Sequence, residues 1–182
     1  MVCAPSGTGK TTIYKDLLCK HPDLKFSVSY TTRKKRADEV DGLDYFFIDR
    51  ERFIRMKEKN EFIEWASVHN ELYGTERKQI EEYLQKGKIC ILDLDVQGAL
   101  NVMKEFDDAV TVFIRPPSLE ELERRLKERG TESEKKVKLR LLNAQKELEY
   151  TDHFQYIVVN DMVEAAVKRL EEIIEIKIKK RK

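Results

Sequence analysis

The chain has 182 residues, a length typical of one domain or of one core with small insertions. Its 35 Lys and Arg residues nearly balance 34 Asp and Glu residues, and a net charge of +1 excludes a strong general attraction to nucleic acid or acidic membranes. Charged residues make up 38% and hydrophobic residues 41% of the chain, which favours a folded protein with a densely charged surface over a disordered one.

The sequence predicts neither a membrane span nor a secretory leader. The longest unbroken apolar run has four residues, and the amino terminus lacks a charged segment followed by an apolar stretch. Three cysteines, Cys3, Cys19 and Cys90, form no C-x-x-C pair, and the three histidines are scattered, so neither a disulfide framework nor a zinc site is indicated. We therefore expect a cytoplasmic protein that binds no membrane.

Strand and helix signals alternate along most of the chain, a pattern typical of a parallel sheet flanked by helices. We expect strands at residues 1–4, 88–93, 109–114 and 156–159. We expect helices after Lys10, over 119–150 as two in tandem, and over 161–176. Capping boxes at Ser118 with Glu121 and at Thr131 with Glu134 predict where the tandem helices begin, with Gly130 ending the first.

Residues 26–75 differ from this pattern. Short strand-like pieces at 26–31, 44–48 and 62–68 surround one helical segment near 50–59. This arrangement predicts an inserted, β-rich subdomain.

The segment from Ala4 to Thr11 (APSGTGKT) lies between a predicted strand and a predicted helix. It matches the phosphate-binding loop G-x-x-x-x-G-K-[ST], with Ala4 in place of the first glycine. Gly7 and Gly9 allow the main chain to curl around one anion, Lys10 would reach the β and γ phosphates, and the Thr11 hydroxyl would bind Mg²⁺. A glycine-rich turn that only starts a helix is the alternative, and the complete motif favours nucleotide binding. Only three residues precede Ala4, so either the strand is short or a few native residues are missing.

Further segments follow in a characteristic order: 26–36 (FSVSYTTRKKR), 39–45 (EVDGLDY), 61–65 (EFIEW), 73–75, 91–98 (ILDLDVQG), 125–130 (RLKERG) and 157–161. With residues 4–12, they resemble the guanylate kinase family over nearly the whole chain. The resemblance implies phosphoryl transfer from Mg-ATP to GMP, and also to dGMP, in an α/β fold of the P-loop NTPase type. It implies a core of residues 1–25, 76–118 and 151–182, a GMP-binding subdomain at about 26–75 and a helical lid at about 119–150.

The resemblance also implies a site for GMP. The residues implied to hold its phosphate are Arg33, Arg36, Ser29, Tyr45 and Tyr73, and those implied to read guanine are Glu64, Thr75 and Asp95. Arginine offers planar, charge-assisted donors to phosphate oxygens, and carboxylates accept from guanine N–H groups that adenine lacks. Without the resemblance, residues 33–36 would be interpreted as a solvated basic loop. The family often has serine where this chain has Thr75.

The remaining implied residues serve ATP and the transferred group. The residues implied to bind ATP are Ser6, Gly7, Thr8, Gly9, Lys10, Thr11, Thr12 and Asn160, and Thr11 and Asp93 would hold Mg²⁺. The catalytic residues would be Lys10, Arg33, Arg125, Arg129 and Arg140. Structural alternatives exist for three of the residues that serve ATP, Mg²⁺ or catalysis. Asn160 could be a helix N-cap, Asp93 could cap a helix from Val96, and Arg125 could be the ion-pair partner of Glu121.

Two other functions stay open from the sequence. A guanylate-kinase-like module could bind phosphopeptides without catalysis, and a related kinase could use another acceptor. The intact phosphate loop, Asp93 and the predicted lid arginines favour the kinase. The partners expected are therefore GMP or dGMP and ATP, with no nucleic acid, for a monomer or a homodimer.

Overall fold

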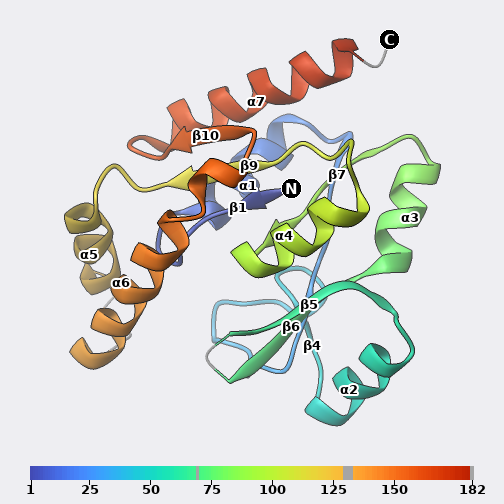
Figure 1. Ribbon diagram of the computed structural model, residues 1–182, viewed down its shortest axis with the longest axis horizontal. Helices are drawn as coiled ribbons and strands as arrows, with labels where there is room; N and C mark the ends of the chain where they lie inside the picture. Colours follow the sequence, from blue (N-terminus) through green and yellow to red (C-terminus); the bar gives the residue numbers. More distant parts are fainter. Residues whose placement is uncertain (69, 129–132, 181–182) are drawn as a thin grey trace. The chain divides into compact units, whose positions relative to one another are not determined.

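The computed structural model describes residues 1–68, 70–128 and 133–180 (Figure 1). The chain divides into two compact units, which are described separately. Unit 1 comprises Met1–His21 and Asp108–Lys182, and unit 2 comprises Pro22–Asp107. The fold is α/β, with parallel strand pairs in both units and a mixed sheet in unit 2, as the sequence predicts. Among the described residues, no helix is both long enough and apolar enough to cross a membrane.

Unit 1 is built on three parallel strands. The central strand β9 (Val112–Arg115) pairs with β1 (Val2–Cys3) on one side and with β10 (Tyr156–Val159) on the other. Phe113 and Ile114 of β9 are completely buried, as expected for an apolar run inside a parallel sheet. The strands predicted in this unit are therefore confirmed, although β1 is short.

Helices of unit 1 place apolar stripes against the sheet and each other. Helix α1 (Lys10–Lys20) packs on α7 (Val163–Lys180), which buries Val167 and Leu170. The predicted end of α7 at residue 176 is wrong, because no glycine or proline follows to stop the helix there.

The two tandem helices predicted over 119–150 are α5 (Leu119–Glu128) and α6 (Glu134–Leu148), which lie side by side in Figure 1. Leu122 and Leu126 of α5 form a buried cluster with residues of α6. The Ser118 hydroxyl accepts a hydrogen bond from the Glu121 amide at 3.2 Å, which confirms the Ser118 half of the first predicted capping box. The second predicted cap is wrong, because α6 begins at Glu134 with Ser133 as its N-cap. Gly130 and Thr131 themselves lie outside the described residues. A short 3₁₀ turn, Thr151–His153, leads from α6 towards β10.

Unit 2 contains two sheets. Strand β2 (Leu24–Phe26) pairs in parallel with β7 (Ile89–Ile91). A mixed sheet has the order β4-β3-β6-β5, where the strands are β3 (Tyr30–Thr31), β4 (Phe46–Phe47), β5 (Phe62–Val68) and β6 (Glu71–Glu76). The other elements are α2 (Arg50–Glu58), α3 (Arg77–Gln85), β8 (Asp93–Leu94) and α4 (Val96–Glu105). The β-rich region and its helix near 50–59 are thus confirmed.

One predicted strand, at residues 26–31, is two strands in different sheets. The Gln79 side-chain oxygen accepts from the Ser27 hydroxyl and from the Val28 amide, each at 2.9 Å. The Val28 amide therefore has a hydrogen-bond partner where the chain leaves β2, and it does not need one from a neighbouring strand. The break cannot be predicted locally, because Gln79 is about fifty residues away in the sequence.

Strand β6 was not predicted, because its sequence ELYGTE includes a glycine and two glutamates. Gly74 has a packing reason. A β-carbon at this position would lie 3.0 Å from the rings of Phe53 and Phe62, so a larger residue would have to push these rings away. Those rings stack with their centroids 4.6 Å apart and belong to the core of the mixed sheet, with Tyr30, Met56 and Leu72.

We expect Phe53→Ala to lower the free energy of unfolding by about 3–5 kcal/mol, because Phe53 is completely buried and its loss leaves a cavity beside Phe62. The adjacent Ile54 is 40% exposed and provides the matched control. Urea unfolding of both variants checks this, with Ile54→Ala expected to cost less than about 1 kcal/mol. Equal losses in the two variants would contradict the assigned core.

Candidate functional site

The phosphate loop of unit 1 connects β1 to α1. Gly7 and Gly9 have φ angles of +94° and +96°, in the left-handed region that favours glycine, whereas Ala4 has no positive φ and is buried. The alanine that replaces the first glycine of the motif therefore causes no backbone strain. Lys10, Thr11 and Thr12 follow as the first residues of α1, and Thr11 and Thr12 are exposed. The first turn of an α-helix, with its amides and the positive end of its dipole, is the kind of end that binds anions.

Thr8, in the middle of the loop, is completely buried and is held from several sides. Its hydroxyl donates to the carbonyl oxygen of Pro5 at 2.7 Å. Its own carbonyl oxygen accepts from the Asn160 side-chain amide at 2.6 Å and from the Arg125 guanidinium at 3.5 Å. Because this carbonyl is turned towards Asn160 and Arg125, the loop conformation is fixed by residues more than 100 positions away in the sequence.

Asn160 does not cap a helix, since α7 begins three residues later and the Asn160 amide is bonded to Thr8. Its side chain is 1% exposed, and within the described part of the chain its Oδ1 atom has no hydrogen-bond partner. A β-carbon on Gly9 would lie 2.7 Å from the Asn160 Nδ2 atom, so a larger residue at position 9 would disturb the contact between Asn160 and Thr8. The contact of Asn160 with the adenine of ATP stays a prediction.

Arg125 joins the loop to the segment after β10. It donates to the carbonyl oxygens of Asn160 at 3.1 Å and Asp161 at 3.4 Å, and its Nε donates to Glu121 at 2.7 Å. The sequence alternative of a Glu121–Arg125 ion pair is therefore present, and hydrogen bonds from Arg124 and Arg125 lower the pKa of Glu121 to about 2.

Arg140 and Arg129 are the other two predicted lid arginines. Arg140 on α6 donates to the hydroxyl of the exposed Ser6 at 2.7 Å, so it reaches the phosphate loop. Arg129 lies outside the described residues. Contact of these arginines with a nucleotide remains a prediction.

In unit 2, the predicted base-reading residues come together. Glu64 on β5 lies directly opposite Thr75 on β6, and the Thr75 hydroxyl donates to the Glu64 carboxylate at 2.6 Å. The Ser29 and Thr75 hydroxyls share a hydrogen bond at 3.3 Å. Asp95 is the N-cap of α4 and accepts from the Gly98 amide at 2.6 Å. Glu64 and Asp95 line one cavity of about 610 Å³.

Gly98 brings the start of α4 against Glu64. A β-carbon at Gly98 would lie 2.4 Å from the Glu64 Oε2 atom, so any larger residue would displace the carboxylate. Burial is the main cause that raises the pKa of Glu64, from 4.5 to about 7, and the negative charge of Asp95 adds to it, while the Thr75 hydrogen bond opposes it. A largely buried carboxyl group whose pKa is so strongly raised is typical of a functional site.

The predicted phosphate-binding residues of unit 2 form a second group. The Arg33 guanidinium lies over the rings of Tyr45 and Phe47, with its carbon 5.4 and 5.6 Å from the two centroids. The Tyr45 and Tyr73 rings meet edge to face at 5.9 Å. Arg36 is more exposed than Arg33, with exposed side-chain fractions of 54% and 17%.

Asp93 does not cap α4, because Asp95 occupies that position. Asp93 is the first residue of β8 in unit 2, whereas Thr11, the other predicted Mg²⁺ ligand, belongs to unit 1. Their shared role stays a prediction.

Sequence reasoning missed three residues that shape these groups: Glu39 (the ion-pair partner of Arg33), Gly98 and Gln79. The first two lie inside the motif segments 39–45 and 91–98, but the pattern gives no reason for them. The signal that could have found Glu39 is its spacing, since this acidic residue follows Arg36 by three positions and Arg33 by six.

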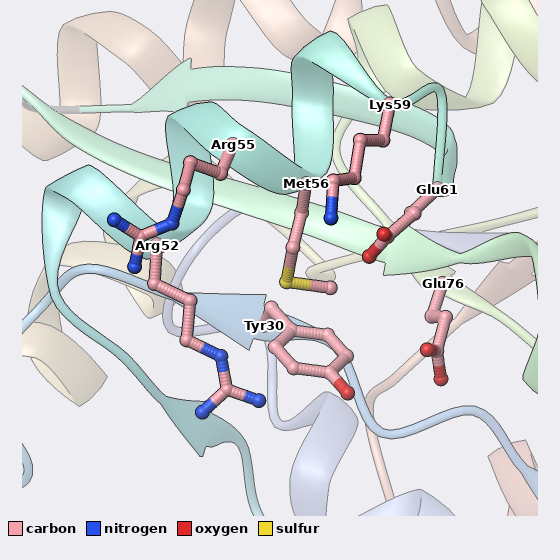
Figure 2. A pocket seen from close by; sticks show the side chains of 7 residues that line it. All are labelled: Tyr30, Arg52, Arg55, Met56, Lys59, Glu61 and Glu76. Atoms are coloured by element: carbon pink, nitrogen blue, oxygen red, sulfur yellow. The ribbon is translucent and has the colours of Figure 1, made fainter.

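A smaller pocket of about 320 Å³ contains none of the predicted site residues (Figure 2). Its lining is Tyr30, Arg52, Arg55, Met56, Lys59, Glu61 and Glu76. Figure 2 shows the two arginines on one side of Tyr30 and the two glutamates on the other. Its three cations belong to or follow α2 and are exposed, which is typical of a solvated helix face.

Comparisons with known proteins agree on one family. A family model described as guanylate kinase matches residues 1–177. The guanylate kinases of Thermotoga maritima and Caldanaerobacter subterraneus subsp. tengcongensis are 48% and 47% identical to this chain over 174 residues, which cover 96% of this chain and 84% of each relative. The crystal structure of guanylate kinase from Anaplasma phagocytophilum is similar with a TM-score of 0.81 and 34% identity, over 97% of this chain and 83% of that one.

We expect Glu64→Gln to stabilise the protein at high pH. A carboxyl group whose pKa rises on folding, here from 4.5 to about 7, costs the folded state stability as pH rises through that interval. The cost approaches ~3 kcal/mol above pH 7, and a neutral amide avoids it while it still accepts from Thr75. Urea unfolding at pH 4.5 and 8.5 should show similar stability at the lower pH and a more stable variant at the higher.

The exposed Glu58 supplies the control, because Glu58→Gln makes the same chemical change on the surface of unit 2 and should leave the pH dependence unaltered. A Glu64→Gln variant less stable than the original chain at pH 8.5 would contradict a buried carboxyl group whose pKa is raised on folding.

Proposed function

The chain belongs to the guanylate kinase family, and on that premise we propose that it transfers the γ-phosphoryl group of ATP to GMP, giving ADP and GDP. The observation that carries the proposal is the family match over residues 1–177, together with 48% identity over 174 residues to a named guanylate kinase. The chemistry of both units supports it. Unit 1 has a phosphate loop with its helix start, and unit 2 has paired carboxyl groups beside a group of arginine and tyrosine side chains.

In this proposal the phosphate loop binds the phosphates of ATP. The amides after Gly7 and the start of α1 would surround the β-phosphate, and the Lys10 ammonium would neutralise the γ-phosphate. Asn160 and Arg125 support the loop through the Thr8 carbonyl, so that its amides are held ready for an anion. Arg140, bonded to Ser6 of the loop, is close enough to this segment to stabilise charge on the transferred group, and we propose the same role for Arg129.

The acceptor would be bound by unit 2. Glu64 and Asp95 would accept from the N1–H and amino group of guanine, and the Thr75 hydroxyl would form a hydrogen bond with its O6 edge. Arg33, Arg36 and the hydroxyls of Ser29, Tyr45 and Tyr73 would bind the phosphate. Because these contacts involve only the base and the phosphate, we extend the proposal to dGMP.

Mg²⁺ fits the donor set, because the Thr11 hydroxyl, the Asp93 carboxylate and nucleotide phosphates are the oxygen ligands that it prefers. When bound, the ion would neutralise negative charge on the phosphate oxygens. A GMP phosphate oxygen would attack the γ-phosphorus in line, with no covalent enzyme intermediate. We further propose that residues 26–75 act as the GMP-binding subdomain and residues 119–150 as a lid that excludes water.

The function is tested by coupled measurement of ADP release with ATP, Mg²⁺ and a nucleoside monophosphate. GMP should support turnover, and AMP should do so at least about 10⁴-fold less efficiently, because AMP leaves the two carboxyl groups without donors. Absence of GMP-dependent turnover would contradict the kinase and favour a binding module. Turnover with another monophosphate alone would contradict the assigned acceptor.

We expect Glu64→Gln to lower kcat/KM for GMP by roughly 10- to 100-fold, because a charge-assisted hydrogen bond to the base is lost. The KM for ATP should change less than about twofold. Glu61→Gln is the matched control, because Glu61 lies three residues earlier and lines the other pocket. If both variants lose guanine use equally, the specific role of Glu64 is wrong.

The KM for GMP should rise as pH falls, since a pKa of about 7 means that the Glu64 carboxylate gains a proton in the free protein and can no longer accept from guanine. Between pH 8.5 and 6.0 we expect an increase of roughly tenfold. The GMP phosphate also titrates near pH 6, so Glu64→Gln, which should show only that substrate effect, gives the baseline. A wild-type profile parallel to that baseline would exclude Glu64 as the titrating group.

A further inference from the structure

The Glu39 carboxylate holds the Arg33 guanidinium in a two-pronged ion pair. The Arg33 Nη2 atom donates to Glu39 Oε1 at 2.7 Å, and Nη1 donates to Oε2 at 3.0 Å. Both side chains are largely buried, with 11% of Glu39 and 17% of Arg33 exposed. A forked pair of this kind fixes orientation as well as charge, because the guanidinium and carboxylate planes must align.

Glu39 also fastens the loop that carries both arginines. Its Oε2 atom accepts from the Arg36 main-chain amide at 2.8 Å, and the Arg36 guanidinium approaches Oε1 at 3.8 Å. Burial alone would raise the pKa of Glu39, but the hydrogen bonds from Arg33 and from the Arg36 amide outweigh it, and the pKa is lowered. These hydrogen bonds therefore favour the ionised form of Glu39 inside this loop.

The contacts of Arg33 leave one edge of its guanidinium for another ligand. Nη1 uses both of its hydrogens, one on Glu39 and one on the Lys34 carbonyl oxygen at 2.8 Å, and Nη2 uses its inner hydrogen on Glu39. Glu39 and Lys34 do not use the outer Nη2 hydrogen or the Nε hydrogen, and the planar group places these two side by side as a second fork. The Tyr73 side chain forms a hydrogen bond with the same guanidinium, and the Tyr45 ring lies beneath it.

We propose that Glu39 is a positioning residue, which holds Arg33 so that its Nε–Nη2 edge faces the phosphate of the acceptor nucleotide. The inference rests on the proposed function, since it takes Arg33 as a ligand of the GMP phosphate. It adds a residue to which neither the family match nor the motif assigns a role. The edge that Glu39 occupies is not the edge presented to the phosphate, so both anions can be bound at once.

The sign of one substitution separates this inference from its alternatives. Glu39→Gln removes a negative charge near a dianionic ligand, so simple electrostatics predicts tighter binding of GMP. Tighter binding is also expected if Glu39 only occupies the phosphate position until GMP displaces it. If Glu39 positions Arg33, the substitution weakens binding instead, because the guanidinium loses its orientation.

The experiment compares Glu39→Gln with Asp38→Asn, a matched change at the exposed neighbouring position of the same loop. ADP release gives KM for each substrate, and calorimetry gives the dissociation constant of GMP. We expect Glu39→Gln to raise KM and Kd for GMP about 10- to 100-fold and KM for ATP less than twofold, with Asp38→Asn within about twofold for both. Unchanged or tighter GMP binding in Glu39→Gln would overturn the inference.

A double-mutant cycle tests whether Glu39 acts through Arg33. In an Arg33→Met background, Glu39→Gln should change Kd for GMP by less than about twofold, because the group that it positions is absent. A full additional loss in that background would overturn the inference. Urea unfolding verifies that each variant is folded, and if Glu39→Gln is not, Glu39→Asp keeps the charge but is too short for the fork and should raise Kd for GMP as well.

The original chain separates the two levels of the argument. If it shows neither GMP-dependent ADP release nor GMP binding, the proposed function fails and the role of Glu39 fails with it. If it is active and Glu39→Gln binds GMP as the original chain does, only the role of Glu39 is wrong.

Discussion

The burial of the Glu64 carboxyl group is the constraint on which the acceptor site depends. A carboxylate removed from water is unfavourable unless hydrogen bonds or cations compensate it, and the described contacts provide the Thr75 hydroxyl as donor and Asp95 as a repelling neighbour. The ligand-free protein meets this cost by raising the pKa of the group. A guanine base would supply two donors to the pair of carboxyl groups, so binding relieves a cost that folding leaves in place.

Close packing makes that burial possible. Glu64 lies on β5, and α4 packs against this strand with Gly98 in its first turn. Glycine is required there because a side chain would occupy the position of the carboxylate. The Asp95 side chain caps the same turn, so one short segment supplies a helix cap, a close approach and the proposed acceptor for the base. The proposed base-reading group therefore depends on the packing of α4 against β5.

Part of this arrangement could be predicted from the sequence, and part could not. The phosphate loop, the strands at β9 and β10 and the tandem helices follow from local patterns, because apolar periodicity, caps and glycine spacing act over a few residues. The role of Asn160 could not be found in this way, since its amide meets Thr8 across 152 positions. Strand β6 was missed because its glycine matters only against two rings from other elements. The family resemblance brought together Glu64 and Thr75, which local patterns do not connect.

The charge balance of the whole chain also explains how its arginines are used. A net charge of +1 provides little general attraction for polyanions, so phosphate binding has to depend on local geometry. Arg33 is paired with Glu39, and Arg125 is paired with Glu121. Each carboxylate reduces the local positive charge and at the same time orients the guanidinium. In the proposed site, an incoming phosphate would therefore meet a donor edge that is already directed, and selectivity would arise from the fit of that edge.

Such paired arginines also limit the cost of an empty site. A guanidinium held in a forked ion pair keeps its hydrogen bonds when no phosphate is bound, so the loop at residues 33–39 need not rearrange to satisfy it. Less conformational entropy is then lost when a nucleotide binds, which favours affinity for the correct ligand over attraction for any anion. The same reasoning applies to Arg125, whose contacts with Glu121 and with the carbonyl oxygens of Asn160 and Asp161 keep the phosphate loop supported before ATP arrives.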